Sequence, residues 1–235
     1  MIERLVPAGE GLVARVRCSQ RSDGDFRCDT NASPSPDHHR RLDRRRQRLM
    51  VGEWTWLKQV HGADVVVVTE SGDKAGSVAD GAVTAVPEAV LALHTADCAP
   101  VVVVGDSAVG VAHAGWRGIV AGVLREVVQA LHSLTPDSGG GLRAVVGPVI
   151  RPSAYEFGPA ELAAVSGAVR GDVTSVTSWG APALDLVSAV RGALRTAGVS
   201  DVEDLGFDTS HECFFSHRVR GERARQATTV RLERV

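Results

Sequence analysis

A series of short apolar runs limits the folds that this chain can adopt. Each run is rich in β-branched residues and is bounded by Gly, Asp or Pro. The runs occupy Val65–Thr69, Val90–His94, Val101–Val104, Val109–His113 and Leu142–Gly147. Runs of this length and composition are typical of strands that are buried on both faces. We therefore expect these segments to form buried strands.

Helical patterns lie between and after these runs. From Ile119 to Leu131, apolar residues recur with helical spacing, which predicts an amphipathic helix directly after Gly118. A second helix is expected to begin at Pro159, and a third to cover about 184–197 before it stops at Gly198. The last segment, QATTVRLERV, alternates as a half-buried closing strand does.

The predicted strands are mixed with helices, and some strands follow one another with no helix between them. This order predicts a fold of the α/β or α+β class. No internal repeat or linker divides the 235 residues, so we expect one domain over residues 1–235 with a sizeable core. Residues 1–50 are the least regular part. Within them, residues 19–39 (SQRSDGDFRCDTNASPSPDHH) are expected to form a loop or a poorly ordered excursion.

Composition excludes several classes of protein. Hydrophobic residues make up 44% and charged residues 23%, as in ordinary soluble globular proteins. The net charge of −2 gives no overall attraction to a polyanion, and the basic cluster His38–Arg48 is interpreted as a solvated, mostly helical surface. No apolar stretch approaches the roughly 20 residues of a membrane span, and the first residues do not resemble a signal peptide. Four cysteines are too sparse for a disulfide framework. We expect a cytoplasmic protein that binds neither nucleic acid nor membrane.

Polar residues at the ends of the apolar runs form the candidate site. Cys98 lies in the turn TADCAP beside Asp97 and near His94, His113 ends a run, and His61 precedes another. Thiolate and imidazole are the side chains that bind zinc best, and the spacing fits no zinc finger. The pattern therefore predicts an open site with three protein ligands and a vacant position for water or substrate.

Each of these residues also has a structural interpretation. A buried cysteine is more often an inert small hydrophobe, and a histidine can simply cap a strand or precede a glycine in a turn. The segment after His113 favours the functional interpretation, because Gly115 and Gly118 permit close backbone approach at the start of a helix. Arg117 adds a fork suited to phosphate or carboxylate.

Other signals are weaker. The loop GPVIRPSAYEFG contains the only tyrosine, and FFSHR places His217 and Arg218 after two aromatic residues that we expect in the core. No GxGxxG, Walker A or GxSxG motif is present. Four further histidines are expected on the surface: His38, His39, His132 and His211.

Six segments between residues 56 and 218 carry a resemblance to a known family: LKQVHGADVV, ADGAVT, LALHTADCAPVVV, GVAHAGWRG, GPVIRPSAYEFG and FFSHR. At these segments the chain resembles the YfiH family, also described as multicopper polyphenol oxidase or laccase-like and as purine nucleoside phosphorylase. The resemblance implies a layered α/β/β/α fold with a surface cleft. It implies a metal, usually zinc, held by His61, Cys98 and His113. The same segments supply the residues expected to bind substrate or phosphate, which are Gln59, Gly115, Arg117, Gly118 and Arg218.

The resemblance also implies several activities. The leading prediction is zinc-dependent phosphorolysis of adenosine, inosine and methylthioadenosine, with adenosine deamination in which Asp97 or His94 shuttles a proton. A nucleoside and phosphate are then the partners, and we expect a monomer. An alternative is a cytoplasmic hydrolase that edits peptidoglycan precursors. Polyphenol oxidation is another, but one Cys/His₂ site lacks the several copper clusters that it requires, so zinc is favoured over copper.

A further alternative is a binding module with structural zinc, which would be closed by a fourth ligand, His94 or His217. The chain also departs from the family pattern at three positions. Val149 and Arg151 stand where the family often has a cysteine and a glycine, and Asp208 stands in place of a second cysteine. These departures predict that the walls of the cleft differ.

Overall fold

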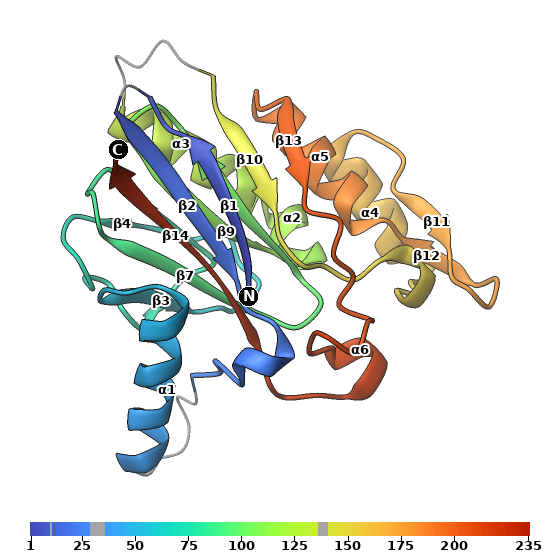
Figure 1. Ribbon diagram of the computed structural model, residues 1–235. Coiled ribbons are helices and arrows are strands. Elements are labelled where there is room, and N and C mark those ends of the chain that lie inside the picture. The colour runs from blue at the N-terminus through green and yellow to red at the C-terminus, as the bar shows by residue number, and fades with distance from the viewer. Residues whose placement is uncertain (10, 29–35, 136–140) are drawn as a thin grey trace.

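The computed structural model describes residues 1–9, 11–28, 36–135 and 141–235. Two six-stranded sheets pack face to face between helices (Figure 1). The first sheet has the order β1 (Ile2–Pro7), β2 (Leu12–Cys18), β14 (Gln226–Arg234), β7 (Val90–Thr95), β3 (Trp54–Lys58) and β5 (Ser77–Val78). The second has the order β13 (Asp201–Asp204), β10 (Arg143–Val146), β8 (Ala99–Val104), β9 (Val109–Ala114), β6 (Gly81–Thr84) and β4 (Val65–Val68).

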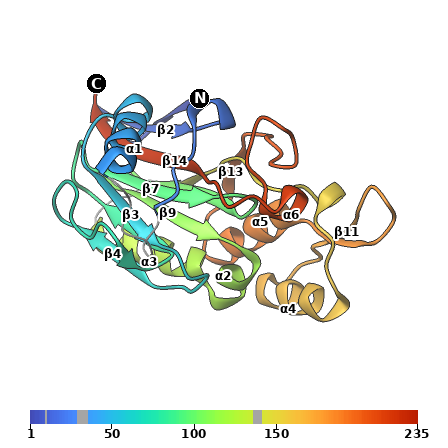
Figure 2. The same ribbon diagram turned by 90° about the horizontal axis from the view of Figure 1, so that it is seen from below.

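Helices cover both outer faces. The outer face of the first sheet carries α1 (Pro36–Leu49), and Figure 2 shows α2 and α4 on the opposite side of the molecule. The remaining elements are α2 (Trp116–Ala121), α3 (Val123–Leu134), α4 (Pro159–Val169), α5 (Leu186–Thr196), α6 (His217–Arg220), the short helices η1 (Arg21–Asp23) and η2 (Pro152–Ala154), and the ribbon β11 (Thr174–Val176) with β12 (Pro182–Leu184). The expected α/β/β/α layering is confirmed.

Strand alternation explains why the central strands are apolar throughout. Along β8, Val102 and Val104 face the cluster between the two sheets, whereas Val101 and Val103 face the cluster beneath α3 and α5. Successive side chains of a strand point to opposite faces, so a strand covered on both faces needs an apolar residue at every position. A third cluster lies under α1. It includes Leu42 and Leu49 of α1 and Trp54 of β3.

The predictions for individual elements need four corrections. The N-terminal part is not irregular, because β1 and β2 pair with each other and β2 pairs with β14. The helical interpretation of the basic cluster His38–Arg48 is confirmed by α1. The long helix predicted after Gly118 is two helices, because Gly122 adopts a left-handed φ of 95° between them. The closing strand β14 is mostly buried, since it lies between β2 and β7. Strand β4 is an edge strand with three of its side chains only partly covered or exposed.

The other predicted strands and the helices at 159 and 184–197 are confirmed. Of the loop predicted over residues 19–39, residues 29–35 lie outside the described ranges. The rest includes the short helix η1 and the start of α1. Among the helices of the described residues, none is long and apolar enough to cross a bilayer.

The connections between the two sheets position the site. The chain leaves β3 of the first sheet, passes His61 and enters β4 of the second. It crosses again from β7 to β8 through the turn that contains Asp97 and Cys98. His113 lies near the end of β9, directly before α2. Three segments that are distant in sequence therefore meet at one end of the two-sheet core.

Candidate metal centre

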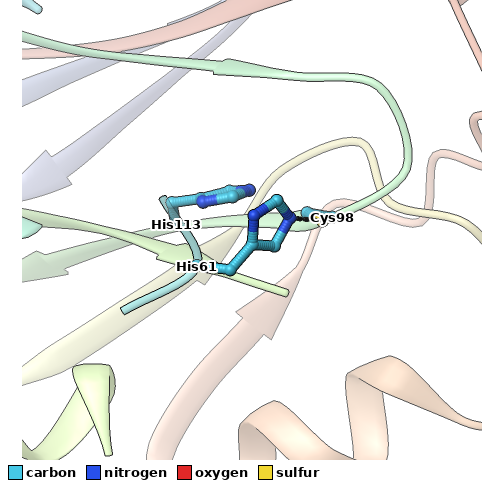
Figure 3. Close-up of side chains that lie close together, drawn as sticks. All are labelled: His61, Cys98 and His113. Carbon is cyan, nitrogen blue, oxygen red and sulfur yellow. Dashed lines mark hydrogen bonds between the residues drawn. The ribbon is translucent and has the colours of Figure 1, made fainter. Parts of the chain in front are cut away.

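The three predicted ligands come together as a cluster. One ligand atom from each of His61, Cys98 and His113 lies within 4.8 Å of the others, and the three side chains point toward one another (Figure 3). The Sγ of Cys98 is 3.7 Å from Nε2 of His61, and the two imidazole rings are 4.7 Å apart between centroids. His113 is buried, Cys98 is half-buried and His61 is exposed, so the cluster opens to solvent on the His61 side.

Asp80 organises two of the ligands at once. Its Oδ1 lies 2.8 Å from Nδ1 of the buried His113, which leaves Nε2 of that ring directed toward Cys98. The same carboxylate accepts hydrogen bonds from the backbone N–H groups of Val60, His61 and Gly62 at 3.1, 2.9 and 2.7 Å. These bonds hold His61 in the left-handed backbone region, at a φ of 61°. A carboxylate behind a ligating histidine fixes the tautomer and the ring orientation that a metal needs.

Two glycines leave room for the cluster. A Cβ atom on Gly115 would stand 2.9 Å from both Sγ of Cys98 and Cδ2 of His61. On Gly118 it would stand 3.2 Å from the carbonyl oxygen of His113 and 3.3 Å from that of Gly62. The structure thus assigns both glycines a steric role beside the ligands. Their predicted contact with substrate or phosphate stays a prediction.

The cluster perturbs its own protonation. Burial disfavours the thiolate of Cys98, but the imidazoles of His113 and His61 outweigh it and lower the pKa of the thiol. Burial also disfavours the charged form of His113, but Cys98 and Asp80 outweigh it and raise the pKa of the imidazole. A depressed thiol pKa makes the thiolate, the form that binds metal, available near neutral pH.

The donor set fits zinc. A tetrahedral zinc with bonds of about 2.0 to 2.3 Å separates its ligand atoms by roughly 3.3 to 3.8 Å. The distance of 3.7 Å between Cys98 and His61 already falls in this range, and all three ligand atoms lie within 4.8 Å of one another. Over the ranges that the structure describes, no fourth His, Cys, Asp or Glu joins the group, so neither His94 nor His217 closes it. Three ligands with an accessible side are the pattern of a catalytic site rather than a structural one.

The cluster lies in a cavity of about 560 Å³. The cavity is also lined by Trp116 and Arg117 at the start of α2, and by Tyr155. Arg117 stacks on Trp116 with its guanidinium carbon 4.5 Å from the ring centroid, and Arg218 stacks on Tyr155 at 4.7 Å. Arg218 also donates from Nη1 to the carbonyl oxygen of Glu156 at 2.7 Å. Cavities of this size bind small molecules, and a guanidinium stacked on a ring can still donate to an anion through its remaining N–H groups.

Asp97 is engaged in holding a loop. Its Oδ1 accepts hydrogen bonds from the hydroxyls of Thr209 and Ser216 at 2.8 and 2.7 Å, and Oδ2 accepts one from the backbone N–H of Arg218 at 2.6 Å. Asp97 thereby attaches the segment between β13 and β14, residues 205–225, to the turn that carries Cys98. We call this segment the C-terminal loop. It must give up one of these bonds before it can shuttle a proton, so that role stays a prediction.

Two other predicted residues have partners of their own. Gln59 bonds through both ends of its amide to the backbone of His94, at 2.8 and 3.0 Å, and so ties β3 to β7 at the edge of the cavity. His94 lines the cavity, and burial together with Arg46 and Arg225 lowers its pKa to about 3, so its ring is neutral. Neither residue touches the metal cluster through a side-chain hydrogen bond that the structure records.

The departures from the family pattern lie outside the cavity lining. Val149 is fully buried, and Arg151 forms a bidentate ion pair with Asp204 at 2.7 and 2.8 Å. Asp208 accepts a hydrogen bond from the backbone of Ser210. None of the three side chains lines the cavity; they pack a loop that bonds to the backbone of Asp97 through Ile150. A difference in the cleft walls stays a prediction.

Sequence reasoning missed several residues that the structure places at the site. Asp80 belongs to the segment ADGAVT, but nothing in the pattern around it indicates that it would face His113. Tyr155 lines the cavity although its loop favoured no particular role, and Arg225 lines it beside the start of β14. The expected burial of Phe214 and Phe215 is confirmed.

The match to known families agrees with this geometry. Residues 18–233 match the family model described as multi-copper polyphenol oxidoreductase laccase. The chain belongs to this family. Within the described residues, the family site of this chain is a single cluster of three ligands rather than several.

Relatives in this laccase family carry a different name. The chain is 33% identical over 218 residues to purine nucleoside phosphorylase YfiH of Escherichia coli K12, covering 84% of this chain and 80% of the relative. It is 41% identical over 175 residues to a purine nucleoside phosphorylase of Xylella fastidiosa, covering 69% of this chain and 66% of the relative, just under two thirds of its length.

Solved structures of family relatives share the fold. YlmD from Geobacillus stearothermophilus superimposes with a TM-score of 0.77 at 27% identity, covering 97% of this chain and 94% of that one. The Neisseria meningitidis protein NMB0706 superimposes with a TM-score of 0.78 at 25% identity, covering 99% and 98%.

Proposed function

We propose that the chain is a zinc-dependent purine nucleoside phosphorylase that acts on adenosine, inosine and methylthioadenosine, with adenosine deamination as a side activity. The observation that carries the proposal is the cluster of His61, Cys98 and His113 on one side of a cavity that also presents Arg117 and Arg218. The names of the relatives support a nucleoside phosphorylase role. Zinc, when bound, supplies Lewis-acid chemistry at the three ligands.

The arginines of the cavity suit the second substrate. Among the described residues, no carboxylate lies within ion-pair distance of Arg117 or Arg218. Arg218 donates from Nη1 to the carbonyl oxygen of Glu156 at 2.7 Å, which leaves its charge without a counter-ion, so both cations can attract inorganic phosphate. Cleavage of a glycosidic bond leaves positive charge on the anomeric carbon. A phosphate held beside that carbon stabilises the charge and then forms the new bond. The partly buried ring of Trp116 offers a surface for the purine in the same cavity.

The phosphate requirement tests the proposal directly. The purified protein is incubated with adenosine, inosine or methylthioadenosine with and without phosphate, and the products are identified by mass. Phosphate-dependent release of the purine together with the sugar 1-phosphate is expected. Equal cleavage in phosphate-free buffer indicates a hydrolase and contradicts the proposal.

Arg117→Ala tests the role of the arginine in that reaction. We expect the apparent KM for phosphate to rise about tenfold or more, because one charge-assisted contact is lost, while the KM for the nucleoside changes little. The matched control is Arg125→Ala, since Arg125 is exposed on α3 outside the cavity and bonds to Glu126. An unchanged KM for phosphate in Arg117→Ala removes this residue from the phosphate site.

A further inference from the structure

The cavity extends beyond the metal cluster to the outer face of the first sheet. The side chains of that face pack beneath α1 and include Trp54, Trp56, Val90, Ala92 and Ala227. Because side chains alternate along a strand, Lys58 and His94 fall on the same face as these residues, and so does Arg225, which directly precedes β14. All three line the cavity together with Trp56. We call Trp56, Lys58, His94 and Arg225 the outer lobe.

The outer lobe carries positive charge without a matching carboxylate. Within the described parts of the chain, no carboxylate lies within 4.0 Å of the ammonium of Lys58 or the guanidinium of Arg225. Arg225 donates from Nη1 to the carbonyl oxygens of Glu222 and Ala224 at 3.1 and 3.0 Å, which fixes the guanidinium but neutralises no charge. Among the described residues that line the cavity, Asp97 is the one carboxylate, and its oxygens already accept three hydrogen bonds.

This charge is a local property of the cavity. The whole chain has a net charge of −2, so its surplus of carboxylates lies elsewhere. Arg225 is also partly withdrawn from water, and burial lowers its pKa. Cys98, Asp97 and Asp25 offset part of this effect of burial without forming an ion pair with the guanidinium. A cation withdrawn from water without a direct ion pair still gains from a bound anion. His94 is neutral and Trp56 is aromatic, so neither side chain carries a negative charge that would repel an anion.

The two ends of the cavity therefore have different chemistry. One end holds the metal ligands with Arg117, and the other holds two cations beside an aromatic wall. Inorganic phosphate needs only the first end. Lys58 and Arg225 at the second end would have a role if the organic substrate itself carried an anionic group.

We infer that the preferred substrate is a purine nucleoside 5′-monophosphate, whose phosphate binds Lys58 and Arg225 while its glycosidic bond lies at the metal cluster. This inference rests on the proposed phosphorylase function. An oxygen of hydrogen phosphate then bonds to the anomeric carbon as the bond from that carbon to the purine nitrogen breaks. The electron pair of the broken bond stays on the purine, which takes the proton of the hydrogen phosphate. The products are the free purine and ribose 1,5-bisphosphate.

Binding of two ligands tests the outer lobe. Titration calorimetry at low salt compares adenosine 5′-monophosphate with adenosine on the zinc-loaded protein. We expect the monophosphate to bind about tenfold tighter, as one charge-assisted contact implies. Arg225→Gln and Lys58→Gln should each reduce this preference, whereas Arg223→Gln, an exposed arginine outside the cavity lining, should leave it unchanged. Circular dichroism verifies the fold of each variant, and the exposed Lys58 gives a second variant if Arg225→Gln does not fold.

The outcomes separate the two proposals. A monophosphate that binds no tighter than adenosine, or a preference that survives both substitutions in the outer lobe, overturns the inference. If adenosine is phosphorolysed without any preference for the monophosphate, the proposed function stands and the inference fails. If the monophosphate binds preferentially through Arg225 and Lys58 but neither compound is cleaved in the presence of phosphate, the phosphorylase function fails and only the anion subsite remains.

Discussion

Gly115 is a residue whose missing side chain makes room for the metal ligands. Its φ of −75° suits any amino acid, so an alanine there meets no backbone strain. The added Cβ would, however, stand 2.9 Å from Cys98 and His61 and force them apart. We expect Gly115→Ala to lower zinc affinity about tenfold or more while the protein stays folded. Competition with a zinc-binding dye measures the affinity.

Gly167→Ala is the control for this substitution, because a Cβ on Gly167 meets nothing within 4 Å. That variant should retain the zinc affinity of the parent protein. If Gly115→Ala binds zinc as tightly as the parent, the metal does not lie between Cys98 and His61.

Cys98 supplies the only thiolate of the cluster. Protein purified without added metal should contain about one zinc per chain, and Cys98→Ser should contain far less, because a serine hydroxyl is a poor zinc ligand at neutral pH. Elemental analysis of the two preparations measures the zinc. Cys213→Ser is the matched control, since Cys213 is exposed and does not line the cavity. Full zinc content in Cys98→Ser would show that the cluster is not the metal site.

At the scale of elements, Glu222 joins the C-terminal loop to η1. It pairs with Arg21 at 2.6 Å and accepts a hydrogen bond from the backbone of Ser216, which lies in the loop that also bonds to Asp97. The guanidinium of Arg21 is the main cause that lowers the pKa of Glu222 from an ordinary 4.5 to about 2. A carboxylate with a depressed pKa stabilises the fold above its unfolded pKa, and this stabilisation is lost as the pH falls toward the folded value.

Glu222→Gln should therefore lower the free energy of unfolding at neutral pH by about 1 kcal/mol, after allowance for solvent screening of a half-buried pair. The difference from the parent protein should shrink as the pH falls from about 4.5 to about 2, where the parent also loses the charge. Urea unfolding at several pH values measures it. The exposed Glu70→Gln is the control, and an equal difference at all pH values would contradict the linkage.

The elements also show what the sequence could predict. The central strands and α4 were predictable because burial on both faces, or a proline at the helix start, leaves a local pattern. Strands β1 and β2 could not be predicted in this way. β1 leaves charged side chains exposed, and β2 is positioned by β14, which lies at the other end of the chain. The sequence also did not indicate the break at Gly122. The helical spacing of apolar residues continues through this position, although the backbone leaves the helical conformation there.

The same distinction holds for the site. Ligand chemistry and strand ends indicated His61, Cys98 and His113, which the structure brings together. The partners that hold them could not be predicted, because a hydrogen bond such as that of Asp80 to His113 depends on the direction of side chains in strands paired only in the fold. Site residues with distinctive chemistry are thus visible in a sequence, whereas the residues that position them require the structure.

At the scale of the whole molecule, the core and the metal cluster are separate. One apolar cluster lies between the two sheets, a second beneath helices α2 to α5, and a third beneath α1. None of them includes a candidate metal ligand. A core of this size does not require a metal to fold. The protein differs in this respect from small zinc domains, in which metal binding supplies the free energy of folding.

Removal of the metal should therefore abolish turnover without unfolding the protein. Chelation tests this more cleanly than His113→Ala, because that substitution also leaves the fully buried carboxylate of Asp80 without its imidazole partner. We expect the chelated protein to unfold cooperatively with a Tm only a few degrees below that of the zinc-loaded protein, to be inactive, and to regain activity when zinc is added. Melting curves and turnover are measured on one preparation before chelation, after it and after zinc is restored. A collapse of the Tm with near-normal turnover at low temperature would show that the metal holds the fold instead of serving the reaction.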